Sequence, residues 1–264
     1  MAHTIRRPYA CYALGHAQIQ LLTHRRTPRL PPDSTMTPDV YAAAREQMVV
    51  AITADTIFAC ASIGKAALGE RVMATLGKVP RHEFVPVELQ PFAYANVPLP
   101  IGFGKTISQP FIVGLMTDLL AIDAGDAVLE IGTGLGYQAA VLAELAQKIY
   151  SVELLEELAN QAKQRLRQQQ YTNIEFKIGN GYYGWPEHAP YDKIIVTAAP
   201  DLIPPPLIEQ LKAGGKMVIP AGLAEAQRLL LVEKDVTGAL TTAEILSVRF
   251  TQLEGTESAY SRAS

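Results

Sequence analysis

Cysteine is scarce in this chain of 264 residues, which contains only Cys11 and Cys60. Two cysteines so far apart cannot build a disulfide framework, and neither has a second ligand at metal-binding spacing. The five histidines are also scattered, without the close pairs that hold a metal ion. We therefore expect no metal site, and we expect the protein to act in the reducing environment of the cytoplasm.

Strong charge and long apolar runs are missing as well. The formal net charge is -3, whereas nucleic-acid-binding proteins carry a marked basic excess. No apolar run reaches the roughly 18 residues that a membrane span requires. With 48% hydrophobic residues, the chain can still bury a full core. We expect one domain with modest extensions, no nucleic-acid or membrane partner, and a monomer.

The two ends of the chain differ from the rest in composition. Residues 1–37 contain five arginines before the first acidic residue, Asp33. This composition predicts an unstructured extension, or an upstream start codon with Met36 as the functional start. A transit peptide is the alternative. Residues 256–264 are mostly polar, which predicts a flexible tail.

Residues 38–110 are expected to form a helical and loop region that contributes to a substrate groove. A helix is predicted over 66–76, ending before Gly77. The apolar face of that helix carries Ala67, Val72, Met73 and Leu76. Residues 79–103 hold five prolines, which predicts an extended connection without regular elements. A further helix is expected over 111–121, with Ser108 as its N-cap.

Strand-like and helical segments alternate in residues 111–255. Strands are expected at 127–131, 148–153, 173–178, 191–198, 216–220, 228–234 and 244–253, and helices at 137–147, 154–169 and 205–211. Such alternation predicts an α/β fold of the doubly wound, Rossmann-like class, with a mostly parallel seven-stranded sheet. Because no helix separates the last two strands, they should form an antiparallel hairpin at one edge.

A glycine-rich loop directly follows the first of these strands. It reads Glu130-Ile131-Gly132-Thr133-Gly134-Leu135-Gly136, and a helix begins after it. Glycines allow a tight turn and a close approach to free helix N–H groups, at the edge where doubly wound sheets bind ligands. Glu153 ends the next strand and can accept both hydroxyls of a ribose. The expected contacts of a ribose-bearing cofactor are Gly132, Thr133, Gly134, Gly136, Glu153 and Leu154.

The identity of the cofactor depends on the third glycine and on the acid before the first one. A nicotinamide fingerprint needs a glycine where this chain has Tyr137, and Glu130 would repel a pyrophosphate. The same carboxylate would attract the cationic methionine part of S-adenosylmethionine. We therefore expect S-adenosylmethionine, with Glu130 among its contacts.

The pair Asn180-Gly181 follows the third strand and should face the same crevice. The Asn180 side-chain oxygen could accept a hydrogen bond from the adenine amine. An ordinary Asn-Gly turn explains the pair equally well. Both readings stay open at this point.

Several longer motifs make residues 72–253 resemble the protein-L-isoaspartate O-methyltransferases. The motifs are Val79-Pro80-Arg81-His82-Glu83-Phe84-Val85-Pro86, Pro98-Leu99-Pro100-Ile101-Gly102, Thr106-Ile107-Ser108-Gln109-Pro110, the loop from Glu130 to Gly136, Gly184-Trp185-Pro186-Glu187, and the segment from Tyr191 to Pro200. The resemblance implies methyl transfer from S-adenosylmethionine to the misplaced α-carboxylate of isoaspartyl proteins and peptides. The ester then collapses to a succinimide, which reopens partly to normal aspartate.

The resemblance also implies roles for particular residues. It assigns the active-site position to Ser108, and it makes Thr106, Ile107 and His82 candidates for substrate contact; a structural role is the alternative for His82. The family usually has Asp at the position of Asn180, and often Gln where this chain has Lys105. An amide keeps the acceptor oxygen but loses the charge. Residues 1–65 match the family poorly.

The chain has no His-Asp or Cys-His motif for nucleophilic catalysis. A carboxylate nucleophile needs none, because it is already ionised at neutral pH. The protein then only has to align the reactants and exclude water, and Ser108 could hold one carboxylate oxygen as a neutral donor. Three alternatives remain: a methyltransferase of the same fold acting on another carboxylate or side chain, a nicotinamide oxidoreductase, and a non-catalytic binding module.

Overall fold

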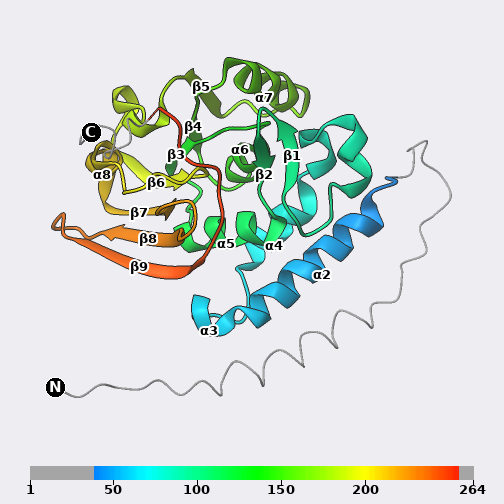
Figure 1. Cartoon of the computed structure of the whole chain (residues 1–264), viewed down its shortest axis with the longest axis horizontal. Coiled ribbons are helices and arrows are strands. Elements are labelled where there is room, and N and C mark those ends of the chain that lie inside the picture. Colours follow the sequence, from blue (N-terminus) through cyan, green and yellow to red (C-terminus); the bar gives the residue numbers. More distant parts are fainter. Residues whose placement is uncertain (1–38, 256–264) are drawn as a thin grey trace.

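A computed structural model describes residues 39–255, and it has the expected alternation of strands and helices (Figure 1). The expectations for residues 1–37 and 256–264 lie outside this range. The helices are α2 (Ala42–Phe58), α3 (Cys60–Ile63), α4 (Glu70–Lys78), α5 (Pro110–Leu120), α6 (Tyr137–Ala143), α7 (Glu156–Gln168) and α8 (Pro205–Gln210), with 3-10 turns η1 (Arg81–Phe84), η2 (Val87–Phe92), η3 (Gly181–Tyr183) and η4 (Pro186–His188). The strands are β1 (Leu99–Gly102), β2 (Lys105–Ile107), β3 (Ala127–Ile131), β4 (Lys148–Glu153), β5 (Ile174–Ile178), β6 (Tyr191–Val196), β7 (Leu211–Ala221), β8 (Arg228–Lys234) and β9 (Leu240–Ser247).

Seven strands form one sheet in the order β5-β4-β3-β6-β7-β8-β9. Neighbours from β5 to β7 are parallel, whereas β8 pairs antiparallel with both β7 and β9. The doubly wound fold and its antiparallel edge are therefore confirmed. The strand order reverses between β3 and β6, and in such sheets the ligand crevice lies at the carboxyl ends of the strands at this reversal.

The two faces of the sheet bury different side chains. Val128, Ile149 and Ile195 belong to a core shared with α5, α6 and α7, and α2 and α4 add to the same core. Leu129 and Ile194 point the other way, toward α8. Side chains alternate along a strand, so Glu130 shares the face of Val128 and points toward the helices. No helix within residues 39–255 combines the length and the apolarity needed to cross a membrane.

The N-terminal region differs from the sequence expectation in two places. Helix α4 begins at Glu70 rather than at residue 66, and Ala67 is exposed outside it. At this start the Asp118 carboxylate, which is distant in sequence, accepts from the N–H of Gly69, the residue before the helix, at 2.6 Å. Residues 79–103 are not an irregular connection either, since they form η1, η2 and β1, and β1 pairs antiparallel with β2.

The start of α5 corrects the expected role of Ser108 as an N-cap. Gln109 occupies the N-cap position, and no side chain of the helix caps it. Instead Asn96 Oδ1 accepts from the Phe111 N–H at 2.9 Å, and Asn96 Nδ2 donates to Asp55 of α2 at 2.9 Å. A partner distant in sequence thus satisfies the helix end, and the Ser108 hydroxyl is not used for it.

The last strands also differ from the predicted bounds. Strand β7 is longer than 216–220, and β9 covers 240–247 instead of 244–253. The turn at Gly238 sets the hairpin register, with Leu240 opposite Lys234. After β9 the chain leaves the sheet edge, and Gln252 forms a single parallel bridge to Ala199 beyond β6. Residues 251–254 therefore lie at the carboxyl ends of the central strands.

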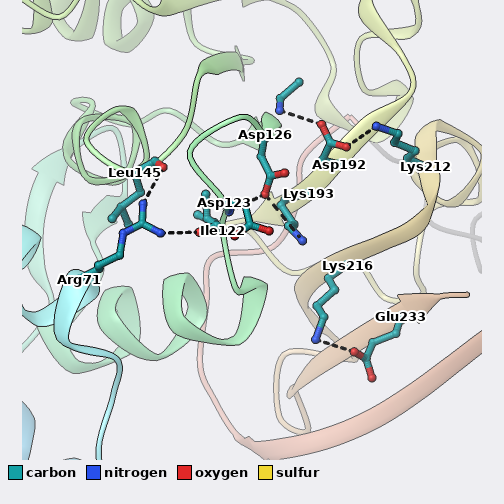
Figure 2. Close-up of polar contacts among 11 residues, drawn as sticks. Arg71, Ile122, Asp123, Asp126, Leu145, Asp192, Lys193, Lys212, Lys216 and Glu233 are labelled. Atoms are coloured by element: carbon teal, nitrogen blue, oxygen red, sulfur yellow. Dashed lines mark hydrogen bonds and ion pairs between the residues drawn. The ribbon is translucent and has the colours of Figure 1, made fainter.

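Polar contacts also connect the segments at the amino-terminal ends of the strands, on the opposite side of the sheet from residues 251–254 (Figure 2). Asp192 at the start of β6 accepts from the Ala127 N–H at 3.0 Å and from Lys212 Nζ at 2.6 Å. Nearby, Arg71 of α4 donates to the carbonyl oxygens of Ile122 and Leu145 at 3.1 and 3.2 Å. These contacts fix the starts of the strands. The loops at the carboxyl ends of the strands take no part in them and can therefore bind a ligand.

Candidate active site

A cleft of about 630 Å³ opens at the carboxyl ends of β3, β4 and β6. Of the residues expected to contact the cofactor, it is lined by Gly132, Gly134, Glu153, Leu154 and Gly181. Thr106, expected on the substrate side, lines it as well. Strands far apart in sequence thus deliver these residues to one place, as the strand reversal between β3 and β6 requires.

The glycine loop is shaped by backbone conformations that favour glycine. Gly132, Gly134 and Gly136 have φ values of 95°, 56° and 97°. A Cβ on Gly132 would lie 2.4 Å from Thr197 Oγ1, which donates to the carbonyl oxygens of Ile131 and Gly132 at 3.0 and 2.7 Å. A Cβ on Gly136 would lie 2.8 Å from Leu166 Cδ1 of α7. Gly136 therefore serves helix packing, and it does not line the cleft.

Gly132→Ala should destabilise the fold by about 1–3 kcal/mol, because a side chain in this backbone region is strained and has no space. Urea unfolding measures the change in the free energy of unfolding. Gly125→Ala is the matched control, since a Cβ there meets no atom within 4 Å and φ is not in the left-handed region. Equal stability of the two variants would contradict the close packing of Gly132 against Thr197.

Glu153 is held in place by the backbone of two loops. Its Oε2 accepts from the Gly134 N–H at 2.8 Å, and its Oε1 accepts from the Leu155 N–H at 3.1 Å. Each carboxylate oxygen can accept a second hydrogen bond. The carboxylate at the cleft wall is thus preorganised for two hydroxyl donors, which is the arrangement that a ribose needs.

Glu130 does not form part of the cleft wall, contrary to the expectation that it meets the methionine part of the cofactor. It is fully buried, because its side chain points from the central strand toward the helices. Ser151, its register partner on β4, donates to Glu130 Oε2, and Ser151 also contacts Thr133 Oγ1 at 2.6 Å. Oε1 has no hydrogen-bond partner in the described chain. Burial raises the pKa of Glu130 to about 8.

The free energy of unfolding should therefore decrease as the pH rises, and part of this decrease should depend on Glu130. Its pKa of about 8 in the folded state lies above the ordinary 4.5, so between these values the folded protein binds a proton that the unfolded chain has released. Rising pH then favours unfolding, by up to about 1.4 kcal/mol per pH unit in this window. Urea unfolding of the cofactor-free protein from pH 5 to 9 should show a shallower decline for Glu130→Gln. The exposed Glu157→Gln on α7 is the control, and identical curves for all three proteins would contradict the burial of Glu130 as an acid.

Asn180 lies beside the cleft rather than in its wall. Its Oδ1 accepts from the Tyr182 N–H at 3.0 Å, and its Nδ2 donates to the Gly255 carbonyl at 2.8 Å. The first contact gives Asn180 a local structural role, as the alternative of a turn at Asn180-Gly181 implies, and it leaves a second lone pair on Oδ1 for an adenine amine. Contact with adenine stays a prediction for Asn180. Its neighbour Gly181 lines the cleft, with no room for a Cβ against Ile131.

Two further cavities adjoin the cleft. We call the first the groove, a space of about 790 Å³ lined by Pro98, Ser108, Gln109, Ile112 and residues 247–251. The second, the inner pocket, has about 400 Å³ and is lined by Ile107, Ser108, Leu135, Tyr137 and Gln138 among others. Thr106 and Thr197 line all three spaces. The cleft, the groove and the inner pocket therefore adjoin one another at these two threonines.

Ser108 lies between the groove and the inner pocket. It is half-buried, and within residues 39–255 no hydrogen bond engages its hydroxyl. Its backbone carbonyl, by contrast, accepts from Arg81 Nη2 at 2.7 Å. A serine hydroxyl that faces an open space without a partner can donate to a bound carboxylate.

His82 is not placed with Ser108 at the boundary between the groove and the inner pocket. Its Nδ1 contacts the Tyr94 hydroxyl at 2.8 Å, its Nε2 lies 3.3 Å from Glu83, and its ring stacks on Tyr41 with 4.2 Å between the centroids. It lines neither the cleft, the groove nor the inner pocket. These contacts match the structural role that was the alternative for this histidine.

Sequence reasoning missed the part that the C-terminal segment plays in the site. Residues 251–254 line the cleft, although the sequence pattern assigned most of them to an edge strand. Glu254 pairs with Lys105 of β2 at 2.5 Å, so the β1–β2 hairpin and the C-terminal segment meet beside the cleft. Thr197 was not singled out either, because the sequence pattern placed it inside the predicted strand at 191–198.

Comparison with known proteins gives consistent matches. A model of the protein-L-isoaspartate(D-aspartate) O-methyltransferase family matches residues 61–258. Protein-L-isoaspartate O-methyltransferase 1 of Polaromonas sp. is 62% identical over 228 residues, which are 86% of this chain and 97% of that protein. A solved protein-L-isoaspartate O-methyltransferase has a TM-score of 0.68 at 29% identity, over 80% of this chain and 66% of that one. A Plasmodium falciparum structure in complex with S-adenosyl-L-homocysteine agrees in fold, with a TM-score of 0.67 at 20% identity over 82% of this chain and 99% of that one.

Proposed function

Because the chain belongs to the protein-L-isoaspartate(D-aspartate) O-methyltransferase family, we propose that its active centre is the junction of the cleft, the groove and the inner pocket. The protein is an S-adenosylmethionine-dependent methyltransferase that acts on the free α-carboxylate of L-isoaspartyl residues. The observation that carries the proposed centre is the position of Ser108, which lines both the groove and the inner pocket and whose hydroxyl has no hydrogen-bond partner among the described residues.

The residues of the cleft fit the cofactor. Glu153 would accept the ribose hydroxyls, and Gly132 and Gly134 would let the backbone approach the methionine part. Leu154 and Gly181 would lie against the adenine, with Asn180 at its amine. When bound, S-adenosylmethionine supplies a methyl group on a sulfonium. Thr133, which lines the inner pocket, and the buried Glu130 would keep the loop in place through Ser151.

The groove would hold the isoaspartyl peptide. Its α-carboxylate is ionised at neutral pH and needs no general base. Ser108 would donate its hydroxyl proton to one carboxylate oxygen, which orients the other oxygen toward the cleft without neutralising the group. Ile107 and Thr106 would bound the substrate on the side of the β1–β2 hairpin. Alignment at near-attack distance and exclusion of water account for the catalysis.

The alternative functions have less support. A nicotinamide oxidoreductase is disfavoured by the family match and by Tyr137 at the position of the third glycine. A methyltransferase for another carboxylate could use Ser108 in the same way, and it is disfavoured by the family match alone. A non-catalytic module would not require a serine without a hydrogen-bond partner at the groove. The open groove also favours a peptide over a small metabolite.

Peptide binding tests the proposed groove directly. The protein loaded with S-adenosylhomocysteine is titrated with an isoaspartyl peptide and with its normal aspartyl twin in a calorimeter. Binding of the isoaspartyl peptide alone is the expected result, and it should weaken when Ile112, which lines the groove, is changed to Asp. Equal binding of both peptides would contradict the placement of the substrate in the groove.

We also propose that the protein is a cytoplasmic monomer. The low cysteine content supports a reducing compartment, and the exposed large apolar side chains of the described residues are distributed over many separate elements. Cell fractionation followed by size-exclusion chromatography should find a 28.7 kDa species in the cytoplasmic fraction. A stable dimer, or recovery in another compartment, would contradict this proposal.

A further inference from the structure

A buried arginine lies directly behind the proposed catalytic serine. Arg81 of η1 has an exposed fraction of 0%, and no carboxylate of residues 39–255 forms an ion pair with it. Burial lowers its pKa to about 10, so the guanidinium is still charged at neutral pH. Burying a charge without a counter-ion is unfavourable, and other contacts must account for its presence.

The contacts of Arg81 join three separate segments. Its Nε donates to the Ala93 carbonyl at 2.8 Å, in the connection before β1. Its Nη2 donates to the Ser108 carbonyl at 2.7 Å, just before α5. The guanidinium carbon lies 4.7 Å from the ring centroid of Tyr137, which begins α6 directly after the glycine loop. One side chain therefore connects the serine to the loop that shapes the cofactor cleft.

A planar guanidinium suits these contacts better than any other side chain. Its donors diverge at fixed angles, so two carbonyls from different segments can be held in one plane while the face packs on an aromatic ring. A lysine ammonium is a point donor on a flexible chain and cannot fix both carbonyls with the same geometry. An apolar residue would leave the carbonyls without their donor.

We propose that Arg81 is a positioning residue for Ser108. It holds the Ser108 backbone against the start of α6 and thereby sets the position of the hydroxyl relative to the methyl donor in the cleft. This inference rests on the role proposed above for Ser108.

A double-mutant cycle tests the proposal. Arg81→Gln and Ser108→Ala are made singly and together, and kcat and KM for an isoaspartyl peptide are measured beside the Kd for S-adenosylhomocysteine. Because a misplacement of about 1 Å can reduce a rate about 100-fold, Arg81→Gln should lower kcat/KM about 100-fold when Ser108 is present. In the Ser108→Ala background the same change should lower it by no more than about threefold. The Kd should change little in both backgrounds.

Arg71→Gln is the matched control. Arg71 also donates to two backbone carbonyls, those of Ile122 and Leu145 (Figure 2), but it lines neither the cleft, the groove nor the inner pocket. Its replacement should lower the melting temperature and leave kcat/KM nearly unchanged. It should also combine additively with Ser108→Ala.

The outcomes separate this proposal from the one on which it rests. If Ser108→Ala has no effect on turnover, the role of Ser108 fails. If Ser108→Ala has its effect but Arg81→Gln causes the same loss in both backgrounds, or weakens cofactor binding in parallel, Arg81 is only part of the scaffold. If Arg81→Gln does not fold, the cycle is run with Arg81→Lys, which keeps the charge, and the same criteria apply.

Discussion

Replacing Ser108 with alanine should lower kcat for an isoaspartyl peptide about 100-fold or more, the usual effect of removing one donor that holds a reacting group. Ser108 lines the groove and the inner pocket, and its hydroxyl has no hydrogen-bond partner in the described chain. The N-terminal end of α5 is capped by Asn96 and not by Ser108. The substitution should therefore leave the fold intact. The Kd for S-adenosylhomocysteine, measured by calorimetry, should stay within about threefold of the original value.

Ser247→Ala is the control for this result. Ser247 lines the same groove, but its hydroxyl accepts from Arg228 at the surface end of β9. It should have little effect on kcat. Parallel loss of turnover and cofactor affinity in Ser108→Ala, or full activity, would contradict the view that Ser108 holds the carboxylate.

Replacing Glu153 with glutamine should weaken cofactor binding about 100-fold, because hydrogen bonds to a charged acceptor contribute about 1.5–3 kcal/mol each. The glutamine amide would also direct N–H groups toward the N–H groups of Gly134 or Leu155, which now donate to the carboxylate. The KM for S-adenosylmethionine should rise accordingly, while kcat at saturating cofactor should fall much less. Steady-state kinetics with varied cofactor concentration measures both.

Glu254→Gln is the matched control for Glu153. Glu254 also lines the cleft, but it is about half exposed and its partner is Lys105. The change in KM should therefore be no more than about threefold, as for an exposed ion pair. An unchanged KM in Glu153→Gln, or equal effects of the two variants, would contradict the assignment of Glu153 to the ribose.

The sheet was largely predictable from the sequence because its signals are local. The glycine loop, the two acids and the alternation of strands and helices lie within short windows. Strands β3, β4, β5, β6 and β8 appear close to the predicted positions. The errors arose where distant residues decide an element boundary. Asp118 contacts the residue before α4, and Asn96 caps the start of α5. Strand β9 ends at Ser247 because the following segment leaves the sheet edge and Gln252 pairs with Ala199 beyond β6.

The site was predictable only in part for the same reason. Glycines and an acid at a strand end are visible in the sequence, so Gly132, Gly134 and Glu153 could be found. The sequence could not show that Glu130 points toward the helices instead of the cleft. Nor could it show that Arg81 contacts Ser108, because the two are 27 positions apart and only the tertiary packing brings them together.

Methyl transfer to a matched pair of peptides tests the central claim most directly. The two peptides have the same sequence and differ only in whether one residue is linked as L-isoaspartate or as normal aspartate. With S-adenosylmethionine labelled in its methyl group, we expect label to enter the isoaspartyl peptide alone, as a base-labile ester, and to fall strongly with Ser108→Ala. Equal labelling of both peptides, or label in neither, would contradict the account.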